Sequence, residues 1–162
     1  MKSSVVIGVG NPAVSDDAVG IEVARWLKQD LAGVPGITVS EVYNDGLDLM
    51  EAMAGFDQAV LVDAIVTGRA PGTIHRLTLD DVSSRESAST NHNESIAIAL
   101  EFGRLSGVKI PETVHVWAVE AGELKAFREG LTEEVRKAIP VVAAEILQEL
   151  FPHKCEAGKF DS

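Results

Sequence analysis

The sequence predicts an α/β fold in three layers, α/β/α, around a mixed, mostly parallel sheet of five strands. Short apolar runs alternate with stretches of helical periodicity along most of the chain. The chain has 162 residues, and 46% of them are hydrophobic, which is enough for one compact core. We therefore expect a single domain over residues 1–150 and a flexible tail over 151–162.

Five runs rich in β-branched and other apolar residues are the expected strands. They cover Val5–Ile7, Ile37–Val42, Ala59–Val62, Thr73–Leu77 and Val114–Val119. Only nine residues separate Asp63 from Thr73, which is short for the helical crossover that parallel neighbours require. We therefore expect the strand at 73–77 to run antiparallel, which makes the sheet mixed.

Periodic spacing of apolar residues predicts four helices between these strands. They cover residues 16–31, 47–55, 92–106 and 132–150. In the last of them Pro140 removes a backbone donor, so we expect a bend there and no end of the helix. Residues 81–91 are small and polar and predict a surface loop directly before His92.

The charge of the chain excludes some classes of partner. The formal net charge is −11 and the pI is 4.7, so a phosphate backbone would be repelled and nucleic acid is not expected as a partner. The first apolar run is too short for a signal peptide or a membrane span. We expect a cytoplasmic protein that does not insert into membranes, and the sequence does not indicate an oligomeric state. Cys155, the single cysteine, excludes an internal disulfide.

Three residues at element ends are candidates for a metal site: Asp17, Asp63 and His92. Asp17 opens the first helix, Asp63 ends an apolar strand, and His92 opens a helix after the polar loop. In a parallel sheet, the strand ends and the following helix starts share one edge of the domain. Two carboxylates and an imidazole suit a divalent ion such as nickel or zinc and leave coordination positions open for chemistry.

A structural role explains each of these residues individually as well. Asp17 and Asp16 suit the positive end of a helix macrodipole, and for Asp16 we prefer that interpretation. Asp63 could accept hydrogen bonds from backbone N–H groups at a strand end, and His92 could be a surface histidine at a helix terminus. The remaining histidines have no acidic neighbour in the local sequence and stay outside the predicted site: His75, His115 and His153.

The glycine turn after the first strand resembles the start of a dinucleotide-binding motif. The third glycine of that motif is replaced by Ala13, and Asn11–Pro12 stands where the helix should begin. The following acids would repel a pyrophosphate. A nucleotide site is therefore disfavoured.

Several motifs occur in the order and approximate spacing of the nickel-iron hydrogenase maturation endopeptidases, which the chain resembles from about residue 4 to residue 150. They are Gly8–Asn11 with Ser15–Gly20, Asp45–Gly46, Val62–Ala64 with Pro71–Thr73, Ser89–Asn93, and Gly130–Thr132 before a proline-containing last helix. The chain departs from the family pattern at Ala121, where a proline is expected after Glu120, and at Asn44–Gly46.

The resemblance implies a phosphorylase/hydrolase-like fold and an endopeptidase activity. The expected partner is the precursor of a [NiFe] hydrogenase large subunit, whose C-terminal extension is removed after nickel insertion. Asp17, Asp63 and His92 match the metal-contacting positions and are the expected catalytic and nickel-reading residues. The nickel is carried by the substrate, and another divalent ion could bind transiently. Two alternatives stay open: a nickel or precursor chaperone that does not cut, and an aspartic-type peptidase that needs no metal.

Overall fold

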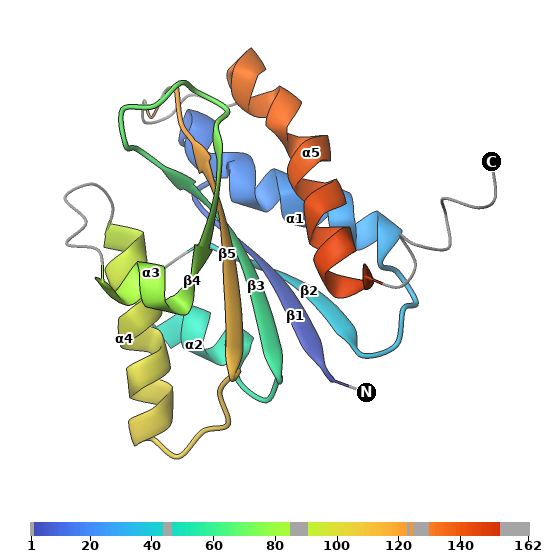
Figure 1. Cartoon of the computed structure of the whole chain (residues 1–162), viewed down its shortest axis with the longest axis vertical. Helices are drawn as coiled ribbons and strands as arrows, with labels where there is room; N and C mark the ends of the chain where they lie inside the picture. Colours follow the sequence, from blue (N-terminus) through green and yellow to red (C-terminus); the bar gives the residue numbers. More distant parts are fainter. Residues whose placement is uncertain (1, 44–46, 85–90, 123, 125–129, 153–162) are drawn as a thin grey trace.

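A five-stranded sheet forms the centre of the molecule (Figure 1). The structure is a computed structural model that describes residues 2–43, 47–84, 91–122, 124 and 130–152. The strands are β1 (Ser4–Val9), β2 (Ile37–Val42), β3 (Gln58–Ile65), β4 (Ile74–Thr78) and β5 (Thr113–Glu120). Their order across the sheet is β2-β1-β3-β5-β4. All five predicted strands are therefore present.

The sheet is mixed and mostly parallel, as predicted. β1 pairs in parallel with β2 and β3, and β3 pairs in parallel with β5. β4 runs antiparallel to β5 at the edge, with Ile74 opposite Val119. The short connection after β3 crosses the end of β5 to reach that edge, which a short loop can do only because no parallel return is needed.

Helices cover both faces of the sheet and complete the three layers (Figure 1). α1 (Val19–Asp30) and α5 (Glu133–Leu150) pack on one face, with Val60 and Trp117 in the core beneath them. α2 (Leu47–Met53), α3 (Leu79–Ser84) and α4 (Asn91–Leu105) lie on the other face, over a core that includes Leu61 and Val116. Because neighbouring strand residues point to opposite faces, β3 and β5 supply side chains to both cores.

The structure divides the first predicted helix and adds one that was not predicted, α3, while the ends of the other helices shift by at most two residues. The first helix begins with a 3₁₀ turn, η1 (Ser15–Ala18), before α1 starts. Residues 81–84, predicted as loop, belong to α3. Thr78 caps that helix: its backbone N–H donates to the Asp81 carboxylate over 2.8 Å, and its hydroxyl accepts the Asp81 N–H over 3.3 Å. This reciprocal capping stabilises a helix in a segment too polar and short to show periodicity.

The last helix continues through Pro140 and reaches Leu150, so the proline does not end it. Among the helices that the structure describes, none has the length and apolar character needed to cross a bilayer. The predicted tail beyond residue 152, with Cys155 and His153, lies outside the described residues, as do Asn44–Gly46 and residues 85–90.

Candidate active site

The candidate site lies where the order of connections along the sheet reverses. From β1 the chain passes through α1 to β2 on one side, whereas from β3 it continues toward β4 and β5 on the other side. The helices that follow β1 and β2 therefore leave the sheet on opposite faces. Open α/β sheets bind ligands in the crevice outside the carboxyl ends of the strands at such a reversal, and here those are the ends of β1 and β3.

Asp17 lies in η1, directly above the end of β1. Its Oδ2 accepts a hydrogen bond from the backbone N–H of Asn11 over 2.9 Å, and its side chain is partly exposed. Gly10 permits this fold of the loop, because a Cβ there would lie 2.0 Å from the carbonyl oxygen of Asp17. The glycine-asparagine turn thus holds one Asp17 oxygen and fixes the orientation of the carboxylate.

Asp63 lies within β3 and is 5% exposed. The strand does not end there as predicted but continues to Ile65, because β5 pairs with it as far as Glu120. The pairing of β1 with β3 stops one residue earlier, at Val62. Asp63 therefore stands at the level where β1 ends, and its Oδ1 accepts the N–H of Ala64 over 2.8 Å.

A close approach of α1 to the sheet brings the Asp17 and Asp63 segments to the same edge. A Cβ on Gly20 would lie 2.2 Å from the carbonyl oxygen of Val62 and 2.6 Å from that of Val9. Only glycine permits the first turn of α1 to sit directly on the ends of β1 and β3. η1, which carries Asp17, contacts β3 as a result.

His92 is the second residue of α4, as predicted within one residue. α4 leads into β5 and so runs opposite to the parallel strands, with its amino end toward their carboxyl edge. The His92 side chain lies outside the described part of the chain. Among the side chains that are described, no group of three His, Cys, Asp or Glu residues could hold a metal ion. The meeting of Asp17, Asp63 and His92 around one ion therefore stays a prediction.

Asp16 has a role that the sequence analysis missed. It is fully buried, and its carboxylate accepts the backbone N–H groups of Gly122 and Thr132, each over 2.7 Å. The Thr132 hydroxyl adds a contact of 2.9 Å. Asp16 does lie in the first turn of η1, but the helix-terminal interpretation left out its main contacts, through which its carboxylate joins η1 to the end of β5 and the start of α5.

A family model described as hydrogenase maturation protease matches residues 21–149. The chain belongs to the hydrogenase maturation protease family. It is 27% identical to the hydrogenase 2 maturation protease of Escherichia coli (strain K12), over 94% of this chain and 93% of that protein. It is also 26% identical to an expression/formation protein, HoxM, of Azotobacter vinelandii, over 89% of this chain and 72% of that one.

Solved structures agree with this assignment. The hydrogenase maturating endopeptidase HybD from Escherichia coli superposes with a TM-score of 0.71 at 26% identity, over 91% of both chains. The solution structure of an endopeptidase from Escherichia coli gives a TM-score of 0.76 at 25% identity, over 99% of both chains. The family resemblance and the α/β fold predicted from the sequence are thus confirmed, and this maturation protease is an endopeptidase.

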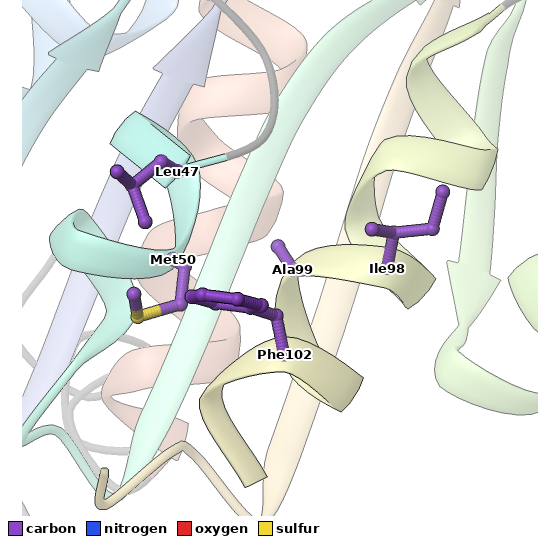
Figure 2. A pocket seen from close by; sticks show the side chains of 5 residues that line it. All are labelled: Leu47, Met50, Ile98, Ala99 and Phe102. Atoms are coloured by element: carbon purple, nitrogen blue, oxygen red, sulfur yellow. The ribbon is translucent and has the colours of Figure 1, made fainter. Parts of the chain in front are cut away.

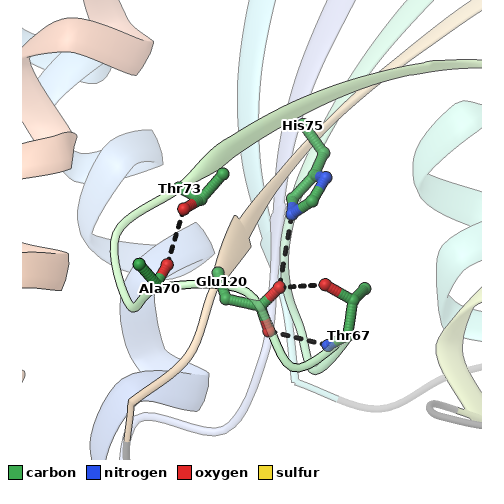
Figure 3. A network of polar contacts seen from close by, with 5 residues as sticks. All are labelled: Thr67, Ala70, Thr73, His75 and Glu120. Carbon is green, nitrogen blue, oxygen red and sulfur yellow. Dashed lines mark hydrogen bonds and ion pairs between the residues drawn. The ribbon is translucent and has the colours of Figure 1, made fainter.

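Another buried acid of the maturation protease, Glu120, lies at the carboxyl end of β5 (Figure 3). It is 1% exposed and ends β5. One oxygen accepts the Thr67 N–H over 2.7 Å, and the other accepts the Thr67 hydroxyl and lies 3.3 Å from Nε2 of His75. Burial raises the pKa of the Glu120 carboxyl, but the bonds from Thr67 and the pairing with His75 outweigh it, so the pKa is lowered.

Glu120 also fixes the loop between β3 and β4 through its backbone. Its N–H donates to the carbonyl of Thr73, and its carbonyl accepts the N–H of Gly72, each over 2.8 Å. The Thr73 hydroxyl in turn donates to the Ala70 carbonyl over 2.6 Å (Figure 3). The loop is therefore held at the carboxyl edge without the proline expected at Ala121.

The strand histidines gain their acidic partners only in the folded protein. His75 pairs with Glu120, and His115 lies 3.2 Å from Glu149 of α5. These partners are more than 30 residues away along the chain, so no local pattern could have revealed them. Neither histidine belongs to the predicted metal-reading trio.

Proposed function

We propose that this maturation protease removes the C-terminal extension of a nickel-loaded [NiFe] hydrogenase large-subunit precursor in the cytoplasm. Asp17, Asp63 and His92 would read the nickel that the precursor carries and hold the scissile peptide at the carboxyl edge. The observation that carries the proposal is the packing of α1 on β1 and β3 through Gly20, since it brings the Asp17 and Asp63 segments to one edge.

Charge balance explains why the metal would act as a recognition element. Docking a precursor over the crevice would remove water from Asp17 and Asp63, and an unpaired buried carboxylate is costly. A nickel ion in the precursor offsets that cost because it supplies two positive charges near both carboxylates. A precursor without nickel lacks this compensation, so it would bind weakly and escape cleavage.

The same arrangement provides the groups that peptide hydrolysis needs. A divalent ion carried by the substrate can polarise the scissile carbonyl, and a nearby carboxylate can take a proton from the attacking water. Asp17 and Asp63 are both candidates for that general base. The hydrogen bonds from Asn11 and Ala64 hold the two carboxylates in defined orientations. A carboxylate that is already oriented toward the attacking water transfers a proton more efficiently than one that must first find the right geometry.

The proposal can be tested with purified protein and three forms of precursor: nickel-loaded, nickel-free and zinc-loaded. We expect that only the nickel-loaded form is trimmed. Trimming is monitored by gel shift and by mass spectrometry of the released extension. Equal trimming of all three forms would identify an aspartic-type peptidase that needs no metal. Binding of the nickel-loaded precursor without trimming would identify a chaperone and overturn the proposal.

A further inference from the structure

α4 carries two apolar stripes where a helix on a sheet needs only one. The inner stripe, which includes Ile96 and Leu100, is buried against the sheet with 2% and 3% exposure. The outer stripe consists of Ile98, Phe102 and Leu105, which follow the i, i+4, i+7 spacing of one helix face. Their exposed fractions are 63%, 50% and 78%. A contiguous exposed apolar face of this kind marks an interaction site.

Ile98 and Phe102 of the outer stripe line one side of a groove whose other side is α2 (Figure 2). Leu47 and Met50 of α2 face Ile98 and Phe102 of α4 across a space of about 290 Å³, with Ala99 at its base. We call this feature the α2/α4 groove. Its lining is apolar throughout, and an apolar groove between two helices suits helix-in-groove recognition, in which an amphipathic helix inserts its apolar face.

Two acidic side chains of α2 lie beside the groove, on the side of the helix that faces β2. Asp48 and Glu51 are exposed, and with the other described residues neither forms an ion pair. Both line the neighbouring cleft between α2 and β2, where Glu41 is paired with Arg25. A second copy of this chain would bring the same acids and a net charge of −11 against them. The charge therefore favours a partner with basic residues beside its apolar face.

The groove leads away from the candidate active site. α2 and α4 precede the parallel strands β3 and β5, so both run against the strand direction. Their carboxyl ends meet at the opposite edge, where the Gly55 N–H donates to the Lys109 carbonyl over 2.9 Å. Their amino ends, with Leu47 on α2, therefore point toward the edge that carries Asp17 and Asp63. A substrate held at that edge can extend along the groove.

We propose that the α2/α4 groove docks an amphipathic helix of the large-subunit precursor, apolar on one face and basic beside it. This inference rests on the proposed function and adds to it a second contact with the substrate, away from the scissile bond. Such a contact contributes to binding of substrate and transition state alike, so its loss should raise KM and leave kcat unchanged.

The test introduces a charge into the groove and measures binding and trimming separately. Ile98→Glu and Phe102→Glu alter exposed residues that line the groove, and Val141→Glu places the same charge on a half-exposed position of α5, on the opposite face. We expect each groove variant to raise KM and the Kd for nickel-loaded precursor about tenfold. Val141→Glu should change neither, and thermal melting should show that all three variants stay folded.

A charge reversal tests the basic flank of the partner. Asp48→Lys combined with Glu51→Lys should weaken precursor binding, whereas Asp30→Lys, which reverses an exposed charge at the end of α1, should not.

Unchanged binding by Ile98→Glu and Phe102→Glu would overturn the groove assignment, while trimming by the unaltered protein would still support the proposed function. Absence of trimming by the unaltered protein would instead contradict that function, and the binding titration would still report on the groove. A dimer in sedimentation that Ile98→Glu dissociates would assign the groove to a second copy and overturn the inference.

Discussion

Two adjacent aspartates of the maturation protease have different surroundings, which separates their contributions. Asp16 is buried and its carboxylate receives two backbone N–H groups and a hydroxyl. Asp17 is partly exposed at the crevice and receives one N–H. Stability should therefore depend on the first residue and trimming on the second.

A matched pair of substitutions tests this separation. Asp16→Asn removes the charge and replaces one accepting oxygen with an NH₂ group, which cannot accept a hydrogen bond from the N–H of Gly122 or Thr132. It should therefore lower the free energy of unfolding by about 2 to 4 kcal/mol. Asp17→Asn should leave the unfolding free energy within about 0.5 kcal/mol and abolish trimming. Urea titration and the precursor assay measure the two effects. A stable Asp16→Asn protein would contradict the structural role of that carboxylate.

His92→Ala tests the third member of the trio. Loss of an imidazole that contacts nickel should lower kcat/KM for nickel-loaded precursor by about 100-fold or more and leave the fold intact. His115→Ala is the matched control, since that histidine lies on β5 beside Glu149 and away from the trio. Circular dichroism checks the fold of both variants. Normal processing by His92→Ala would remove His92 from the mechanism.

At the scale of elements, the local sequence pattern predicted the strands and the direction of β4. The alternation of apolar runs revealed all five strands, and the short connection after Asp63 revealed that β4 is antiparallel. Contacts between distant segments gave no such signal. Asp16 meets Thr132 across 116 positions and Glu120 meets His75 across 45. The capping of α3 by Thr78 did have a local signal, a threonine followed three residues later by an acid.

Gly20→Ala tests the contact of α1 with the sheet. Alanine is the better helix former, so an uncrowded site would gain about 0.5 to 1 kcal/mol. At Gly20 the new Cβ would lie 2.2 Å from the Val62 carbonyl oxygen, and α1 would have to move away. We expect a loss of at least about 1 kcal/mol in unfolding free energy together with reduced trimming. The sign of the change in unfolding free energy distinguishes a crowded site from an uncrowded one. A gain in stability would show that α1 does not require glycine there.

The Glu120 network that holds the loop between β3 and β4 should give an acid-dependent stability. The pKa of Glu120 is lowered below its ordinary value of 4.5, since the bonds from Thr67 and the pairing with His75 outweigh burial. The stabilisation is therefore complete above pH 4.5 and is lost as the pH falls through the lower, folded value.

Comparison with Glu120→Gln isolates this contribution. Urea titrations should show the variant less stable by a constant amount between about pH 6 and pH 5, with the difference shrinking below the ordinary pKa. Asp57, whose pKa is lowered to about 2 by Lys109 and Ser3, titrates in both proteins and cancels in the difference. A difference that grows on acidification would contradict the assigned direction.

At the scale of the whole molecule, the two faces of the sheet have different surfaces. The carboxyl edge carries Asp17 and Asp63, and the α2/α4 groove lies between two helices of one face. With a net charge of −11, the chain repels other polyanions and further copies of itself. The metal ion and the basic flank that we propose for the precursor would both supply the positive charge that this surface lacks.

The origin of the metal can therefore be tested by treating each protein with a chelator before they meet. If nickel belongs to the precursor, EDTA treatment of the protease followed by removal of the chelator should leave the rate of trimming unchanged. EDTA treatment that removes the nickel from the precursor should abolish trimming. Asp17 and Asp63 would then lose water on docking without a compensating positive charge. Mass spectrometry of the released extension measures both arms. Loss of activity after treatment of the protease alone, restored by a divalent ion, would show that the protease holds its own metal and would contradict recognition through the substrate's nickel.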